Sequence, residues 1–284
     1  MQEQKLLASI VIPVYNQYIS LCKTLFGFSH QTVDCSLFEV ILVDDGSNDE
    51  LFEIGKKIFE KYGSLQGQYC RQVNLGRAAA RNTGIHFARA DIIIFCDADR
   101  YPSNNFVEEH IIAHHEGDEI VIGYSYDYFG RLQYLDSLDW GNIQRYSRCP
   151  AYLKKVATLY DQTGHTDSSL AWISFLVGNA SVRKEILYNI GGFNEEFKEW
   201  GVEHFELALR LYKRGKQFRL CACACNYHIP HSRGNGFYKD SLQKSLQLFG
   251  SYHHDINVNE LMSIMLDPKY PLPKTLFING GKHE

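Results

Sequence analysis

Two aspartates that follow an apolar segment are the residues most able to do chemistry. Asp97 and Asp99 flank Ala98, directly after the apolar run at residues 92–95. Such a run ending in acid predicts a buried parallel strand whose carboxyl end lies at a sheet edge, where open α/β sheets bind ligands. Residues two apart in an extended chain point the same way, so the two carboxylates could converge on one cation or one ligand. A hard divalent cation bound there could neutralise a diphosphate. The alternative is a pair of surface turn residues.

Two more polar clusters end predicted strands. Residues 13–16 include the end of the strand expected at 8–14, and residues 44–47 follow the strand expected at 38–43. In a parallel sheet the three clusters share one edge and should line one crevice. A nucleotide sugar suits such a crevice, because its base and ribose offer hydrogen-bond donors to carboxylates and its diphosphate needs a metal. Arg81 could add positive charge near that diphosphate.

The elements that position these residues alternate between strand and helix from residue 6 to about 125. This pattern predicts an α/β fold with a mainly parallel sheet flanked by helices. Residues 124–171 have poor periodicity and predict loops with short helices. A strong amphipathic helix is predicted over 202–214, and one or two helices after residue 237.

Composition narrows the class of protein. The chain has 284 residues, 45% of them hydrophobic, a net charge of −4 and no long basic run, which argues against nucleic acid as a partner. No segment approaches the roughly 20 apolar residues of a membrane span, and the start lacks a signal-peptide pattern, so we expect a cytoplasmic protein, at most peripheral to the inner face of the membrane. The alternating Cys221, Cys223 and Cys225 predict a half-buried strand with reduced thiols rather than a zinc site.

Several motifs in order resemble those of the family 2 glycosyltransferases, which have the GT-A (Rossmann-like) fold. They are Ile10–Asn16, Val43–Asp49, Asn74–Asn82 with its Asn-x-Gly-x-x-x-Ala-Arg-Asn pattern, and Asp97-Ala-Asp99. Downstream, residues 191–193 and 200–207 resemble the acceptor half shared by galactosyltransferases and polypeptide N-acetylgalactosaminyltransferases. The resemblance covers residues 8 to about 231. It implies a hexosyltransferase with a nucleotide-diphosphate sugar as donor, usually linked to UDP, and Mn²⁺ or Mg²⁺ as cofactor. The acceptor would be a glycan, a glycoprotein or a lipid-linked saccharide.

The same resemblance implies a division of the chain and roles for its donor-side residues. We expect a domain over 1–235, with a nucleotide-sugar half at 1–125 and an acceptor half at 126–235, followed by a helical tail over 236–284. Asp99 would hold the metal, with His228 of the segment 227–231 completing its ligands. The nucleotide contacts implied are the ribose at Asp97 and a base pocket at Pro13, Tyr15 and Asp45, with Asp44 beside it.

The residue that removes the acceptor proton is left open by the motif. Relatives commonly carry Glu-Asp where this chain has Glu203-His204, and the aspartate is their base; retaining relatives carry Asn there. Inverting chemistry with Glu203 as the base is favoured, and the alternative is that Glu203 aligns the acceptor while His204 takes the proton. Trp200 could stack on an acceptor sugar or be a core residue. Glu206 is expected on the acceptor side, or as a helix acid paired with Arg210.

Two other functions stay open. The departure at His204 fits a non-catalytic subunit that binds nucleotide sugar or glycan within a synthase complex. A sugar nucleotidyltransferase also uses strand-end carboxylates and metal, but it usually has a Gly-rich basic loop after its first strand, where this chain has Pro13–Gln17. The tail could mediate self-association or contact with a membrane surface.

Overall fold

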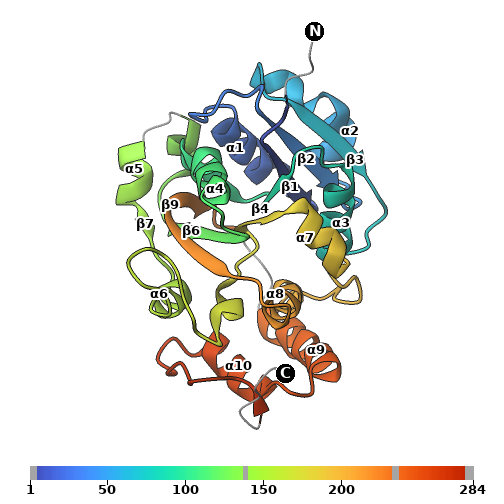
Figure 1. The fold of residues 1–284 in the computed structure, drawn as a ribbon. Helices are drawn as coiled ribbons and strands as arrows, with labels where there is room; N and C mark the ends of the chain where they lie inside the picture. The colour runs from blue at the N-terminus through green and yellow to red at the C-terminus, as the bar shows by residue number, and fades with distance from the viewer. Residues whose placement is uncertain (1–4, 137–139, 232–236, 279–284) are drawn as a thin grey trace.

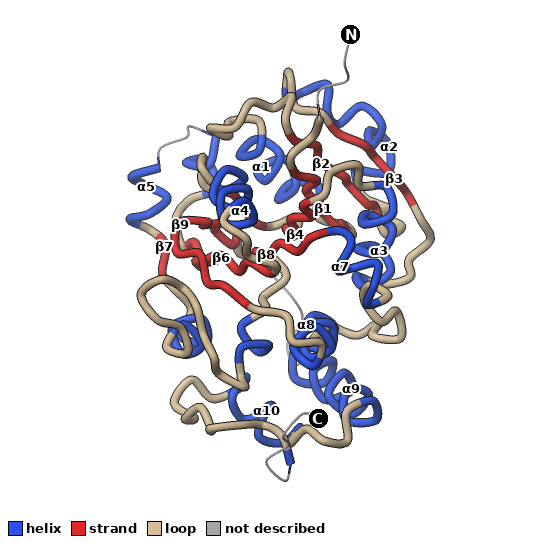
Figure 2. The backbone as a smooth tube through the Cα atoms, in the orientation of Figure 1, coloured by secondary structure: helices blue, strands red, loops and turns tan. Residues whose placement is uncertain are grey.

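A single nine-stranded sheet forms the centre of the molecule in the computed structural model, which describes residues 5–136, 140–231 and 237–278 (Figures 1 and 2). Along the sheet the order is β3-β2-β1-β4-β8-β6-β9-β5, and β7 pairs with β6 off this path. The strands are β1 Ala8–Val14, β2 Phe38–Asp44, β3 Gly67–Arg71, β4 Ile92–Cys96, β5 Arg100–Pro102, β6 Ile120–Tyr128, β7 Ser147–Arg148, β8 Asn179–Arg183 and β9 Phe218–His228.

The expected mainly parallel sheet is confirmed, with an antiparallel insertion. β1 pairs in parallel with both β2 and β4, and β2 pairs in parallel with β3. β8 runs antiparallel to β4 and to β6, so β6 points the same way as β4, and β9 is parallel to β6. The strand ends at residues 14, 44 and 96 therefore lie along one edge, as the sequence predicts.

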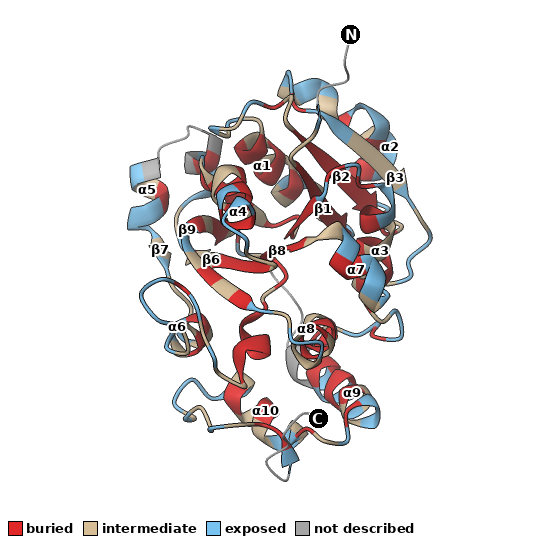
Figure 3. Ribbon diagram, viewed as in Figure 1, coloured by how far each residue is buried: buried red, intermediate tan, exposed pale blue. Residues whose placement is uncertain are grey.

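Each central strand divides its side chains between two apolar layers. In β1, Ile10 and Ile12 belong to the buried cluster beside α1 and α4, whereas Val11 belongs to the cluster on the α3 side. The period of two in an extended strand produces this alternation. Burial on both faces explains why these strands appear in the sequence as continuous apolar runs (Figure 3).

Helices cover both faces of the sheet. Those beside the first layer are α1 Tyr18–Phe28, α2 Glu50–Ile54 with the 3₁₀ helix Gly55–Tyr62, and α4 Phe106–His115. Those beside the second layer are α3 Arg77–Phe87, α6 Ala151–Ala157, α7 Lys184–Ile190, α8 Glu203–Lys213, α9 Phe237–Tyr252 and α10 Val258–Leu266. The segment between β6 and β8 also contains α5 Trp140–Arg145 and the 3₁₀ helices Leu132–Asp136 and Ala171–Ser174.

The C-terminal helices share the core of the second layer. Leu246, Phe249 and Ile264 are buried in the same cluster as residues of the sheet, and the Phe249 ring stacks on Trp172 at 6.0 Å. The expected boundary at 235/236 lies outside the described residues, and that at 125/126 falls within the continuous strand β6. None of the helices in the described ranges is long and apolar enough to span a bilayer.

The cysteine-rich segment is a strand, as predicted. All eight thiols are free, and Cys221, Cys223 and Cys225 lie in β9. The register against β6 shifts at Gly123/Tyr124, where the partner moves from Cys221 to Cys225. This β-bulge bends β9 so that its end reaches the carboxyl edge of β4 through its pairing with β5.

Candidate functional site

A cavity of about 850 Å³ opens at the carboxyl edge of the sheet. This volume is within the range of small-molecule sites. Its walls come from the ends of β1, β2, β4, β6 and β9, from α3, and from the loop that precedes α8. The predicted site residues that line it are Pro13, Tyr15, Asp45, Arg81, Asp97, Asp99, Trp200, Glu203, His204 and His228; Asp44 and Glu206 do not.

The loops after β1 and β2 are tied together at one end of the cavity. The Asn16 N–H donates to Ser47 Oγ at 2.9 Å, and the Asn48 N–H donates to Asn16 Oδ1 at 2.8 Å. Asn16 has a φ of 52°, a left-handed conformation that asparagine tolerates better than most residues. Tyr15 beside it stays 48% exposed, so its ring can cover a planar group entering the cavity.

Asp45 lies at the same end and holds the start of α3. Its Oδ1 accepts hydrogen bonds from Gln72 Nε2 and the Leu75 N–H, and its Oδ2 accepts one from the Gly76 N–H at 2.9 Å. Gly76 has a φ of 94°, which an L side chain rarely adopts. Asp45 therefore contributes both to the cavity wall and to the position of α3.

Asp44 does not reach the cavity, and its expected place beside the base pocket is corrected here. The side chain is fully buried. Its Oδ1 accepts from the Ser47 N–H at 2.8 Å, and its Oδ2 accepts from the Tyr69 hydroxyl at 2.6 Å. Burial, and then the bond to Asp44, raise the pKa of Tyr69. Asp44 thus links β2 to β3 and shapes the turn.

Asp99 and two histidines form a compact cluster at the cavity wall. Asp99 Oδ2 lies 2.9 Å from His231 Nε2 and 3.7 Å from His228 Nε2, and Gln17 Nε2 donates to the same oxygen at 3.2 Å. Pairing of β5 with β9 places Arg100 opposite His228, which explains how residues so far apart in sequence meet. The three ligand atoms lie within 4.8 Å of one another and form the only such group among the described residues. One carboxylate oxygen and two imidazole nitrogens fit a divalent transition metal.

Within this cluster, Asp99 and His228 stabilise each other's charged forms. Burial alone would raise the pKa of Asp99, but hydrogen bonds with His228 and His231 and the charge of Arg100 hold it well below its usual range. Burial acts to lower the pKa of His228, but hydrogen bonds with Asp127 and Asp99 outweigh it and raise that pKa. Asp99 is therefore ionised at neutral pH, as a metal ligand must be.

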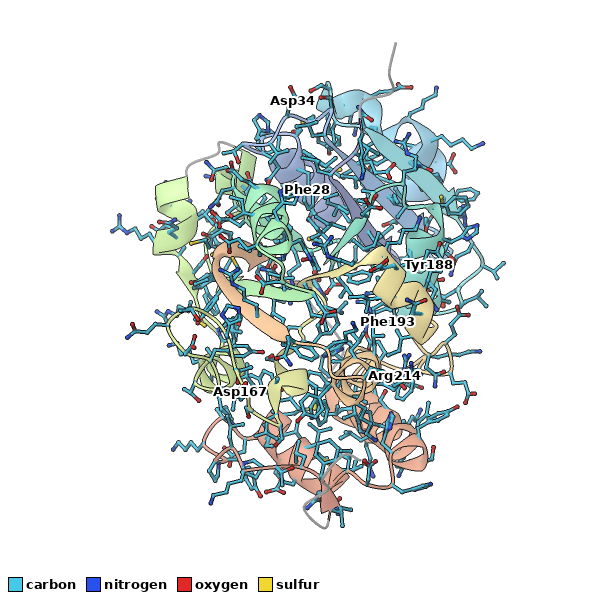
Figure 4. All side chains as sticks on the ribbon, in the orientation of Figure 1. Phe28, Asp34, Asp167, Tyr188, Phe193 and Arg214 are labelled. Atoms are coloured by element: carbon cyan, nitrogen blue, oxygen red, sulfur yellow. The ribbon has the colours of Figure 1, made fainter. Side chains whose placement is uncertain are left out.

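Asp97 lines the same cavity as Asp99 but has different hydrogen-bond partners. Arg81 donates from Nη2 to Asp97 Oδ1 and from Nη1 to Glu203 Oε1, both at 3.0 Å. Arg81 was expected beside a diphosphate. Its side chain lines the cavity, is 2% exposed and joins Asp97 to Glu203. Its guanidinium also lies over Phe193, labelled in Figure 4, whose ring packs edge-on against Phe95.

Oδ2 of Asp97 lies next to Gly178. A Cβ on Gly178 would lie 2.7 Å from Asp97 Oδ2 and 3.2 Å from Arg100 Nε. Any side chain at residue 178 would displace the carboxylate or the guanidinium. Glycine therefore leaves the exposed part of Asp97 accessible from the cavity.

Glu203 and His204 stand at the first turn of α8. Burial alone would raise the pKa of Glu203, but His204, Arg81 and Arg77 lower it far below its usual range. Glu203 Oε2 lies 3.7 Å from His204 Nδ1, and both atoms are buried without a hydrogen-bond partner. The His204 side chain keeps 15% exposure and lines the cavity.

Trp200 and Glu206, both expected on the acceptor side, differ in their placement. Trp200 lines the cavity. Glu206 is buried outside it and forms two hydrogen bonds with Arg210, at 2.8 and 2.7 Å. Arg210 in turn donates to the carbonyl oxygens of Ile190 and Gly192, so Glu206 fastens α8 to the end of α7.

The sequence prediction omitted several residues of the cavity. His231, closer to Asp99 than His228 is, was not selected, although it lies in the segment that was. Arg77, Arg100 and Lys198 bring positive charge to the walls. Arg100 could have been predicted from the sequence, because it directly follows Asp99. Lys198 reaches the cavity only through the fold of the loop before α8.

Comparison with solved structures identifies the class of the fold. TarS from S. aureus in complex with UDP-GlcNAc matches with a TM-score of 0.65 at 16% identity, over 92% of this chain and 72% of that one. The mannosyltransferase PcManGT from Pyrobaculum calidifontis, in complex with GDP-Man and Mn²⁺, matches with a TM-score of 0.61 at 15% identity, over 95% of this chain and 73% of that one. The fold is thus that of GT-A glycosyltransferases.

The chain itself belongs to glycosyl transferase family 2, whose model matches residues 9–187. The model for the N-terminal domain of galactosyltransferase matches residues 160–232. Validoxylamine A glucosyltransferase of Streptomyces hygroscopicus is 28% identical over 261 residues, covering 87% of this chain and 61% of that protein. Chondroitin synthase of Pasteurella multocida is 27% identical over 245 residues, covering 78% of this chain and 24% of that protein. This chain thus spans less than two thirds of the length of these relatives.

Proposed function

We propose that this protein transfers a sugar from a nucleotide-diphosphate donor, a UDP-sugar in the first instance, to a hydroxyl group of a glycan, glycoprotein or lipid-linked acceptor, with inversion and with Mn²⁺ as cofactor. The observation that carries the proposal is the cluster of Asp99, His228 and His231 in the wall of a cavity at the carboxyl edge of the sheet. Membership of glycosyl transferase family 2 supports it, as do fold neighbours solved with UDP-GlcNAc or with GDP-Man and Mn²⁺.

The donor would lie along the strand ends. Pro13 and Tyr15 would contact the base, Asp45 would accept hydrogen bonds from it, and Asp97 would accept them from the ribose. Arg77 and Arg100 would balance the charge of the diphosphate. With the donor bound in this way, the anomeric carbon of the sugar would lie toward Trp200 and the start of α8.

Asp99, His228 and His231 would hold the metal. Their two imidazoles favour Mn²⁺ over Mg²⁺, which prefers an all-oxygen environment. A bound cation offsets the negative charge that develops on the departing diphosphate. Because His228 is also bonded to Asp127, this carboxylate would fix its ring orientation.

The acceptor would enter beside Trp200, which lines the cavity and would stack on the apolar face of a sugar. Its attacking hydroxyl must lose a proton as its oxygen bonds to the anomeric carbon. Glu203 and His204, which also line the cavity, would be the groups that accept it.

Release of nucleoside diphosphate from a panel of UDP- and GDP-sugars, with and without Mn²⁺, tests the proposal. We expect release from one donor that depends on Mn²⁺ and that is accelerated by p-nitrophenyl glycosides as acceptors. Asp99→Asn should abolish it while the protein stays folded, as judged by circular dichroism, and Asp91→Asn, at an exposed position, should leave it unchanged. Donor binding without turnover by the wild-type protein would instead identify a non-catalytic subunit.

A further inference from the structure

Two buried atoms at the start of α8 lack hydrogen-bond partners and face each other. They are Oε2 of Glu203 and Nδ1 of His204, 3.7 Å apart. An unpaired buried polar atom is costly, so two complementary ones at this distance need an explanation. A proton on Nδ1 would point toward a carboxylate oxygen and would give both atoms a partner once the two side chains approach by less than an ångström.

Glu203 is poorly suited to take a proton from the acceptor itself. Its Oε1 accepts a hydrogen bond from Arg81 at 3.0 Å, and its Oε2 is buried toward His204. The side chain is only 5% exposed. Burial acts to raise the pKa of Glu203, but His204, then Arg81 and Arg77, lower it, so the carboxylate stays ionised and has a low affinity for a proton.

His204 is better suited than Glu203 to take the proton from the acceptor. Its Nδ1 is buried, while the remaining exposure of its ring opens to the cavity that it lines with Trp200. If Nδ1 carries the proton, Nε2 is left with a free lone pair, because the two nitrogens of neutral imidazole cannot both be donors. The ring is held by Phe205, whose centroid is 4.3 Å away.

We propose that His204 is the general base of the transfer and that Glu203 is a positioning residue that fixes its Nδ1–H tautomer, with Arg81 hydrogen-bonded to the other oxygen of Glu203. The inference rests on the proposed function. In the step, the acceptor O–H gives its proton to His204 Nε2 as its oxygen forms the bond to the anomeric carbon. The bond from that carbon to the diphosphate oxygen breaks, and its electron pair leaves on the nucleoside diphosphate. The proton later passes to solvent through the cavity.

Arg81 connects the proposed base to the donor site. The same guanidinium that binds Glu203 also binds Asp97, at 3.0 Å on each side. A donor ribose bound by Asp97 would share this carboxylate with Arg81. The base and the donor site are thus connected through one buried side chain.

The Glu203→Gln variant tests the positioning role. It removes the carboxylate that would accept a hydrogen bond from His204 Nδ1, 3.7 Å away. We therefore expect kcat to fall in this variant even though His204 itself is retained.

The test uses the full chain, Mn²⁺, the donor identified by the release assay, and p-nitrophenyl glycosides or water as acceptor. His204→Gln should lower kcat by about 10²–10⁴-fold while the Kd for UDP changes by less than about twofold. His204→Asp, which keeps a proton acceptor, should recover part of the rate. His115→Gln, at an exposed site on α4, is the matched histidine control.

An NMR measurement makes the inference independent of turnover. Nitrogen-15 correlations of the His204 side chain should show the Nδ1–H tautomer in the wild type and its loss in Glu203→Gln. An Nε2–H tautomer, or a His204→Gln variant with the kcat of the wild type, overturns the base assignment and leaves the proposed function standing. A wild-type protein that releases nucleotide from no donor removes the proposed function, and this inference with it.

Discussion

Removing Arg81 should be among the most damaging single changes in the molecule. Arg81→Met leaves two carboxylates without the cation that now lies 3.0 Å from each. Breaking a buried ion pair by deleting one partner costs about 3–5 kcal/mol, and nearly all of this comes from Glu203, which is 5% exposed. Asp97 is 32% exposed and can regain water, so its share is under about 1 kcal/mol. The free energy of unfolding should therefore fall by about 3–5 kcal/mol, and the melting temperature by about 10 °C.

The dependence of this loss on pH is the sharper part of the prediction. In the wild type the pKa of Glu203 is depressed, so its contribution to stability is present above the pKa of an unfolded glutamate and is lost in acid. In Arg81→Met the buried carboxyl takes up a proton more readily. The difference between wild type and variant should thus shrink as the pH falls below the pKa of an unfolded glutamate, about 4.3, measured by urea unfolding at each pH.

Two controls make the result decisive. Adding Glu203→Gln to Arg81→Met should restore part of the stability, because no buried charge then remains unpaired. Lys5→Met breaks an ion pair whose partners are 80% and 71% exposed and should change stability by less than about 0.5 kcal/mol. A loss below about 1 kcal/mol for Arg81→Met, or a loss that does not vary with pH, would refute the reasoning.

The remaining predictions concern α4 and the cavity. Burial lowers the pKa of His110 to about 3 and that of His114 to about 4, so the unfolded chain binds more protons below pH 6.5. The free energy of unfolding should fall by about 1.4 kcal/mol per pH unit for each histidine between pH 6 and 4.5. Urea unfolding of a His110→Gln variant should show a shallower slope, and the exposed His115→Gln should not. Gly178→Ala should displace the Asp97 carboxylate and weaken UDP binding by at least about tenfold, with the melting temperature within a few degrees of wild type; unchanged affinity in calorimetry would contradict the role of Asp97.

The first half of the fold was accessible from the sequence because its signals are local. The strand Ala8–Val14 is where the pattern predicts it, since an apolar run marks it directly. In contrast, α2 gives way to a 3₁₀ helix from Gly55, where a Cβ would lie 2.2 Å from the Tyr69 ring. That close approach depends on tertiary packing.

The second half of the fold was harder to predict from the sequence, because its elements depend on contacts between distant segments. β6 extends to Tyr128, although polar and aromatic residues after Gly123 break its apolar pattern, because β9 pairs with it across a bulge. The sequence proposed the site residues by type, but it could not assign their partners. Glu206 and Asp44 are acidic residues of the kind that bind ligands. Only the structure shows that their carboxylates accept hydrogen bonds from Arg210 and Tyr69 instead.

The most direct test of the central claim is calorimetric titration of the protein with UDP, in the presence and absence of Mn²⁺, for the wild type and Asp99→Asn. We expect Mn²⁺ to strengthen UDP binding to the wild type by at least about tenfold. Asp99→Asn should lose this enhancement while still binding UDP weakly through the strand-end loops. Enhancement of equal size in both proteins would contradict the metal site at Asp99, His228 and His231. Absence of UDP binding in either protein would contradict the nucleotide-sugar cavity itself.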